Sequence, residues 1–245
     1  MTFEELIKSF KVQPELNTDF WSGENNTLNP KIRNALLKTA QIFYDSIELD
    51  EKPPIKDIVF TGSLANYNYS KFSDIDLHLI FDFKQFGQYK EVFETMFLLA
   101  KANWNNRHDI KVKGYEIEIY AEDEDNPHQS TGLYSVLDNQ WIKTPQKQTP
   151  VFDPKDVKSK VDYFIKLYKR LRSQAEDLPP NELLTKVDAL RDKIRKFRQS
   201  GLEQGGEFSD ENIAFKSLRR IGLLDSLADF RDKLLDRSLS VENQK

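Results

Sequence analysis

The chain contains no cysteine among its 245 residues. This absence excludes disulfide frameworks and thiolate metal sites, so it disfavours a small secreted module and fits a reducing compartment. The sequence also lacks any apolar run long enough to cross a bilayer, and its first residues show neither the basic flank nor the apolar segment of a signal peptide. We therefore expect a cytoplasmic protein without a membrane partner.

An excess of positive charge is lacking as well. The formal net charge is −4, whereas proteins that grip long nucleic acids usually carry a strong basic footprint. The charge is uneven, because residues 1–150 carry 16 Lys and Arg against 23 Asp and Glu, while residues 151–245 carry 20 against 17. This balance shows no DNA footprint and is compatible with a small nucleotide that arrives with its own metal ion.

Helical and strand patterns are mixed along the first 150 residues. Asn29 and Pro30 are typical of a helix start, and an apolar repeat of 3.6 residues predicts another helix near residues 84–106. The inward stripe predicted for that helix comprises Phe86, Tyr89, Val92, Phe93, Met96, Leu99 and Ala100. Strand patterns cover residues 55–61, 74–83 and 110–120, and residues 122–148 are predicted as loop with one strand near residues 133–137.

The remainder of the chain shows only helical patterns. Capping residues mark three helix starts, and Gly201 is predicted to end the second helix. We therefore predict an α+β fold with two domains. A mixed sheet flanked by helices occupies residues 1–150, and a C-terminal helical bundle occupies residues 151–245.

A short turn carries residues that are typical of phosphate binding. The strand over residues 55–61 leads into Gly62 and Ser63, where glycine lets a phosphate approach the backbone and a serine hydroxyl adds a donor to the N–H groups. We also expect Asn66, in the same turn, to contact the nucleotide. Taken alone, the turn is equally typical of an ordinary connection between a strand and a helix.

Two aspartates follow on the next predicted strand. The spacing of Asp74 and Asp76 puts both carboxylates on one face with Cα atoms roughly 6.5 Å apart, and Mg²⁺ or Mn²⁺ prefers such oxygen ligands. A third carboxylate completes a site of this kind, as metal ligand or general base. Glu116 and Glu118 are both candidates, because each alternates with apolar residues of a later strand. Glu118 is favoured because it lies in mid-strand, and Glu116 stays open.

Gly62-Ser63 and Asp74-Ile75-Asp76, with their apolar flanks, together resemble the nucleotidyltransferase superfamily of the DNA polymerase beta type. The start Gly-Ser-Leu-Ala-Asn-Tyr is further similar to uncharacterised nucleotidyltransferase-like proteins of bacterial viruses. The resemblance covers roughly residues 55–121 and implies that the predicted mixed sheet is of the nucleotidyltransferase type. It implies an enzyme that transfers a nucleoside monophosphate from a nucleoside triphosphate to a hydroxyl acceptor and releases pyrophosphate. It also implies that Asp74, Asp76 and Glu118 are the metal-binding catalytic residues.

Other features leave the substrate and even the activity open. Lys216 and Arg220 follow a capped helix start, and we expect them to reach the triphosphate. The basic stretch over residues 186–198 is typical of a solvated helix face, and the alternative is that it guides an RNA substrate. The acceptor stays open among RNA, protein and small molecules. A second function class is a non-catalytic nucleotide-binding or antitoxin-like regulatory protein with the same fold.

Overall fold

The computed structural model of the chain describes residues 2–126 and 130–240, and these fall into two compact units. The sheet unit is Lys11–Thr149, and the helical unit consists of the described residues before and after it. Leu6 and Phe10, which lie within the predicted first domain, are buried in the core of the helical unit. In the described part of the chain, no helix is both long and apolar enough to cross a membrane.

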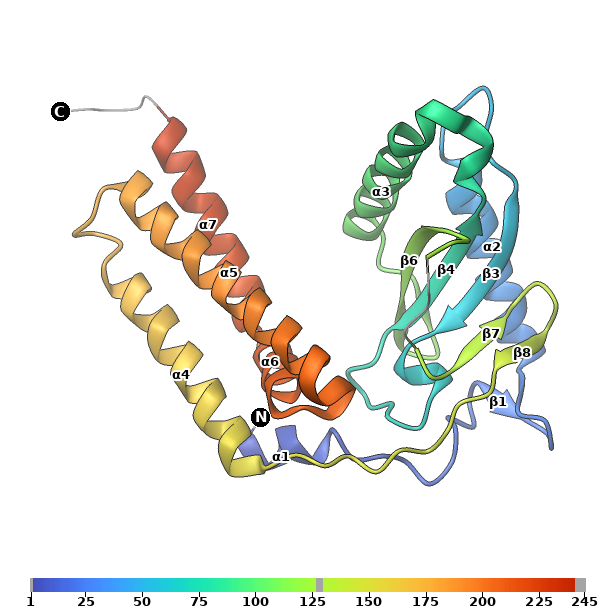
Figure 1. Cartoon of the computed structure of the whole chain (residues 1–245), viewed down its shortest axis with the longest axis horizontal. Helices are drawn as coiled ribbons and strands as arrows, with labels where there is room; N and C mark the ends of the chain where they lie inside the picture. Colours follow the sequence, from blue (N-terminus) through green and yellow to red (C-terminus); the bar gives the residue numbers. More distant parts are fainter. Residues whose placement is uncertain (1, 127–129, 241–245) are drawn as a thin grey trace. The chain divides into compact units, whose positions relative to one another are not determined.

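The sheet unit is built on one six-stranded mixed sheet (Figure 1). Its strands are β3 (Ile55–Thr61), β4 (Ile75–Phe81), β5 (Lys111–Val112), β6 (Tyr115–Asp123), β7 (Leu133–Ser135) and β8 (Gln140–Lys143), and a separate hairpin pairs β1 (Trp21–Ser22) with β2 (Thr27–Leu28). The strand order is β5-β6-β4-β3-β7-β8, with β4 and β6 parallel and the other neighbours antiparallel. The predicted α+β fold with a mixed sheet is confirmed.

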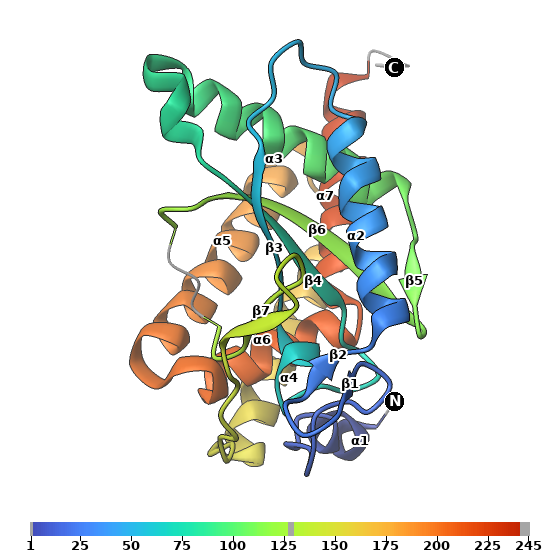
Figure 2. The same ribbon diagram turned by 90° about the vertical axis from the view of Figure 1, so that its right-hand side faces the viewer.

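Helices cover the apolar face of this sheet (Figure 2). They are α2 (Pro30–Asp45), capped by the Asn29 side chain as predicted, and α3 (Lys90–Arg107), which follows two 3-10 helices, η1 (Ser63–Ala65) and η2 (Phe83–Tyr89). The core joins Leu36 and Phe43 of α2 to Leu77 and Leu79 of β4 and to Phe97 of α3. Because side chains alternate along a strand, Asp76 and its neighbours two residues away point to the opposite face.

The predicted inward stripe of α3 is wrong in part. Phe93 packs against the core and Phe97 is fully buried, but Tyr89, Val92 and Leu99 are 58, 54 and 64% exposed. The helix has two apolar stripes, and the sheet takes the one with the larger aromatic rings because they bury more area. The predicted single helix also breaks at Gly87, where φ is 51°, so α3 begins later than residue 84.

The helical unit differs from its prediction at two glycines. Its helices are α1 (Phe3–Lys8), α4 (Pro154–Ser173), α5 (Pro180–Gly205), the 3-10 helix η3 (Gly206–Phe208), α6 (Asp210–Arg220) and α7 (Leu223–Leu239). The predicted third helix is two helices, because Gly222 adopts a left-handed conformation with φ of 73° between α6 and α7. Gly201 does not end α5, which continues to Gly205. The predicted C-terminal helical bundle is nevertheless present.

Candidate functional site

The turn after β3 brings backbone and carboxylate into direct contact. Gly62 follows the last residue of the strand with φ of 77° and ψ of −163°, a conformation that favours glycine. A Cβ atom at position 62 would lie 1.7 Å from Oδ2 of Asp76. Glycine is therefore required both by the backbone conformation and by the space that the Asp76 carboxylate occupies.

The sheet register places two of the predicted acids side by side. In the parallel pair of β4 and β6, Asp76 lies directly opposite Glu118, and in the antiparallel pair with β3 it lies opposite Thr61. Asp74 directly precedes β4, and both aspartates are half-buried. Like charges on directly opposite positions repel one another, so this register concentrates negative charge at one point on the polar face of the sheet.

The two glutamate candidates have different surroundings. The Glu116 side chain is 59% exposed, and its Oε1 lies 3.3 Å from Nζ of Lys111 on the neighbouring edge strand. Glu118 is half-buried, and its Oε2 accepts a hydrogen bond of 2.5 Å from the Tyr120 hydroxyl. Position and burial therefore favour Glu118 over Glu116 as the partner of Asp76.

The pKa of Tyr120 depends on its burial and on all three nearby carboxylates. Burial raises the pKa of this phenol, and the hydrogen bond to Glu118 raises it further. The negative charges of Asp76, Glu118 and Asp74 act in the same direction. Tyr120 therefore stays protonated and remains a donor to Glu118 at neutral pH.

The polar face continues beyond the acids with residues that the sequence analysis did not assign. The His78 ring stacks on Tyr120 with 4.5 Å between ring centroids, and its Nδ1 lies 3.1 Å from Oε1 of Glu122. Nζ of Lys101, from α3, lies 4.4 Å from the centroid of the Tyr120 ring. The alternation Glu118, Tyr120, Glu122 was the available signal, because residues two apart on one strand share a face.

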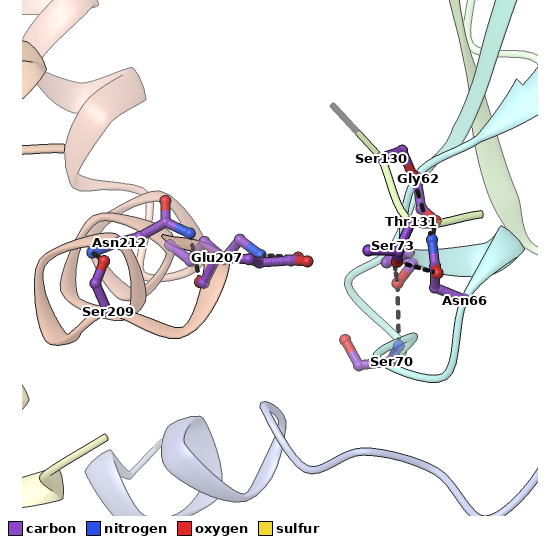
Figure 3. A network of polar contacts seen from close by, with 11 residues as sticks. Gly62, Asn66, Ser70, Ser73, Ser130, Thr131, Glu207, Ser209 and Asn212 are labelled. Atoms are coloured by element: carbon purple, nitrogen blue, oxygen red, sulfur yellow. Dashed lines mark hydrogen bonds and ion pairs between the residues drawn. The ribbon is translucent and has the colours of Figure 1, made fainter. Parts of the chain in front are cut away.

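Asn66 is placed differently from its predicted role. Its Nδ2 donates to the Gly62 carbonyl oxygen at 2.8 Å and to the Ser130 hydroxyl at 3.4 Å, and its Oδ1 accepts from Thr131 Oγ1 at 2.7 Å (Figure 3). These contacts occupy the amide within the protein, so Asn66 braces the turn. Its expected contact with a nucleotide stays a prediction.

Two further contacts tie the turn to residues far away in the sequence. The Thr61 hydroxyl donates to the carbonyl oxygen of Gly132 at 2.9 Å, and a Cβ at Gly132 would lie 2.2 Å from the carbonyl oxygen of Ala65. The Ser63 hydroxyl donates to Ser73 Oγ at 2.7 Å, and this same oxygen accepts from the backbone N–H of Ser70. The role of the segment around Thr131 and Gly132 was not predictable from the sequence, because the segment lies some 70 residues from the turn.

Lys216 and Arg220 both lie on α6 of the helical unit, and both contact other residues of that unit. Nζ of Lys216 lies 2.8 Å from Oε1 of Glu207. The Arg220 guanidinium donates to the Ser9 hydroxyl at 2.5 Å and lies 3.9 Å from the centroid of the Phe10 ring. Their assignment to the triphosphate stays a prediction.

The carboxylates are not gathered as a ready metal site. Within residues 2–126 and 130–240, no three His, Asp or Glu side chains converge closely enough to hold an ion. The donor set nevertheless fits Mg²⁺ or Mn²⁺, because Asp76 and Glu118 present carboxylate oxygens from adjacent strands. The Asp74 carboxylate belongs to the same group, since its charge raises the pKa of Tyr120 as theirs does. Metal coordination requires these side chains to turn toward one another.

Comparison with known proteins gives one match. No curated protein and no solved structure matches the chain. The model of one protein family, described as the nucleotidyltransferase domain, matches residues 47–130, about one third of the chain. The matched segment contains Gly62, Ser63, Asp74, Asp76 and Glu118. Among these residues, Asp76 lies against Gly62 and opposite Glu118. This match supports the assignment of the sheet unit to the nucleotidyltransferase superfamily.

Proposed function

We propose that the sheet unit catalyses metal-dependent nucleotidyl transfer. An acceptor hydroxyl attacks the α-phosphorus of a nucleoside triphosphate, a new O–P bond forms in line with the bond that breaks, and pyrophosphate leaves. The observation that carries this proposal is the position of Asp76, whose carboxylate touches Gly62 of the phosphate turn and lies opposite Glu118. The turn that we assign to the triphosphate and the acids that we assign to the metal are therefore neighbours.

The turn would bind and orient the triphosphate. Backbone N–H groups after Gly62 and the Ser63 hydroxyl are the donors that we assign to phosphate oxygens. In the structure this hydroxyl donates its single proton to Ser73 Oγ, so the proton has to turn away from Ser73 to reach a phosphate oxygen. Since η1 has only three residues, its helix dipole is small, and the individual N–H donors matter more than the helix N-terminus.

The acids would bind the metal and receive a proton. We assign Asp74, Asp76 and Glu118 as ligands of Mg²⁺ or Mn²⁺, which, when bound, supplies charge stabilisation to the triphosphate and lowers the pKa of the attacking hydroxyl. Tyr120 donates to Oε2 of Glu118 and thus orients that carboxylate. Oε1 of Glu118 is then the oxygen that we assign to the metal or to the proton of the acceptor.

Radiolabel transfer tests this proposal. Purified protein is incubated with each α-³²P-labelled nucleoside triphosphate and Mg²⁺, with and without total RNA, and label is followed into RNA, protein and small molecules. Wild-type protein should incorporate label, and Asp74→Asn/Asp76→Asn and Glu118→Gln should not. Glu116→Gln is the matched control, because it removes the same charge two residues away and should leave transfer unchanged. Equal incorporation by Glu118→Gln would refute the assigned role of Glu118.

A non-catalytic nucleotide-binding protein is the second candidate. It is favoured by the absence of a convergent three-ligand metal group in the described part of the chain. Thermal unfolding distinguishes the two candidates. Mg²⁺ and ATP together should raise the melting temperature of an enzyme well above the effect of either alone, because a ligand stabilises only the state that binds it. Binding of ATP that is indifferent to Mg²⁺, without label transfer, would favour the regulatory protein.

A further inference from the structure

The positive charge of the helical unit is concentrated on two of its helices. Residues 154–205, which form α4, α5 and their connection, contain 13 Lys and Arg against 8 Asp and Glu, a net charge of +5. Residues 206–240 contain 6 against 7. The basic character is therefore a property of the α4–α5 pair and not of the whole unit.

Many of these cations are neutralised on their own helix. Arg191 and Arg195 pair with aspartates three residues before them, and Lys158 and Lys186 pair with acids four residues away. Exposed pairs of this kind are typical of a solvated helix face and contribute little. They account for a large part of the basic stretch over residues 186–198 without any ligand.

A second set of cations lines a groove between α4 and α5. Arg170, Lys186 and Lys193 border a groove of about 340 Å³ whose remaining walls are Leu167, Leu171, Gln174, Ala189 and Leu190. A second hollow along α5 shares Ala189 and Lys193 with this groove and is lined further by Lys196, Phe197 and Asp192. The Asp192 carboxylate is paired with Arg195. Within the described residues, no ion pair engages Arg170, Lys193 or Lys196. These three positive charges therefore line the groove, and no acidic side chain in this part of the chain neutralises them.

An aromatic ring stands beside the same cations. Tyr163 of α4 is 44% exposed, its hydroxyl accepts a hydrogen bond from Nζ of Lys193, and its ring centroid lies 4.8 Å from the same atom. The leucines and Phe197 supply further apolar contact area within the groove. Cations without acidic partners, placed beside an exposed aromatic ring, are typical of sites that bind the phosphates and bases of a single-stranded nucleic acid.

We propose that the α4–α5 groove binds single-stranded RNA. Charge complementarity selects a polyanion, since Arg170 on α4 and Lys193 and Lys196 on α5 form no ion pair among the described residues and lie on both walls. Lys186, which also borders the groove, is paired with Glu182. The exposed Tyr163 ring selects bases over an acidic peptide, because every base offers a face for stacking. This inference goes beyond the proposed transfer reaction, and binding is measured without nucleotide or metal so that its outcome is independent of catalysis.

The test is fluorescence anisotropy of a labelled 20-nucleotide single-stranded RNA with the full chain at several salt concentrations. Three phosphate contacts should give a slope of log K against log salt of about −2. Arg170→Gln/Lys193→Gln/Lys196→Gln should lower affinity about tenfold or more and flatten this slope. Lys158→Gln/Arg191→Gln/Arg195→Gln is the control, because it removes the same number of charges from paired positions. Circular dichroism checks that both variants fold.

Three results would overturn the proposal. The first is wild-type protein that does not bind the RNA at low salt. The second is an equal loss of affinity in the two triple variants, which would show that net charge and not the groove matters. The third is displacement of the RNA by poly-L-glutamate at equal charge concentration, which would assign the groove to an acidic protein partner. Retention of RNA by the control variant, with resistance to polyglutamate, would support the groove.

Discussion

The two units handle charge in opposite ways. On the polar face of the sheet unit, Asp76 and Glu118 lie on directly opposite positions, and together with Asp74 they raise the pKa of Tyr120. On α4 and α5 of the helical unit, acids and bases alternate at helical spacing, so that Lys158 and Arg195 each have a partner within one turn. The first arrangement costs stability, whereas the second is nearly neutral.

The difference between the two units indicates which charged residues serve a function. Local pairing explains a charge by its own helix and needs no ligand. Like charges that lie on strands distant in sequence have no such local explanation. They are commonly found together at sites that bind a metal or carry out chemistry. The same criterion separates Glu118 from Glu116, since Lys111 explains the latter. It also separates Arg170 from Arg195 in the helical unit. Substitutions in each unit test this difference in charge arrangement.

The largest effect is expected from Gly62→Ala in the sheet unit. The new Cβ would overlap Oδ2 of Asp76, so the carboxylate must move by an ångström or more. Misplacement on this scale costs roughly 100-fold in rate, and we expect at least that loss of nucleotidyl transfer, measured with labelled nucleotide. Gly23→Ala is the matched control, because Gly23 has a similar φ of 76° and nothing within 4 Å of an added Cβ. Equal losses in both variants would contradict the role given to the contact.

Next comes Gly201→Ala in the helical unit. Alanine normally favours a helix interior, yet here its Cβ would lie 2.4 Å from Cβ of Glu211 and 2.8 Å from the Ser209 hydroxyl that caps α6. We expect a loss of about 2 kcal/mol in the free energy of unfolding, measured by urea denaturation. Gln199→Ala, exposed on the same helix, should change it by only a few tenths of a kcal/mol. Stabilisation by Gly201→Ala would show that α6 yields without cost.

Local patterns made part of the fold predictable. The strand over residues 55–61 has the predicted bounds, and Asn29 caps α2 as expected. The orientation of α3 was not predictable, because two apolar stripes compete and only the packed sheet decides between them. The break at Gly222 was missed because an isolated glycine within an apolar repeat does not by itself end a helix.

The candidate site was predictable only as far as its chain-local parts. Gly62, Ser63, Asp74 and Asp76 lie within one short segment and could be grouped by spacing. The pairing of Asp76 with Glu118 depends on a parallel register between strands some 40 residues apart, which no local pattern fixes. The brace of Asn66 by Thr131 is likewise a tertiary contact between polar residues that have no periodicity.

A buried ion pair in the sheet unit gives a pH-dependent prediction. Burial alone would raise the pKa of Asp123, but the hydrogen bond from Lys90 and the nearby positive charges lower the pKa below its ordinary value. A lowered pKa in the folded state stabilises the fold above the unfolded pKa of about 4, and this contribution is lost as pH falls through the folded value. Asp123→Asn should therefore cost about 1–3 kcal/mol at pH 7.

Below pH 4 the penalty for Asp123→Asn should shrink, because the unfolded wild-type chain takes up a proton at Asp123 that the folded state takes up only at lower pH. Urea denaturation at pH 7 and pH 3 measures both values. Asp125→Asn is the control, since Asp125 pairs with Lys84 at the surface and its loss should be small at either pH. A penalty that is independent of pH would mean that the amide fails for steric and not electrostatic reasons.

The smallest effect is expected from Thr131→Val, which removes one hydroxyl of the brace and keeps the shape of the side chain. Oδ1 of Asn66 then loses its donor, and stability should fall by about 1 kcal/mol. If the brace positions the turn for the triphosphate, KM for the nucleotide should rise severalfold while kcat changes little, because the acids on the sheet are untouched. Thr27→Val, at an exposed hairpin position, should change neither constant. A fall in kcat at constant KM would instead connect the brace to the acids, since the effect would then arise after the nucleotide has bound.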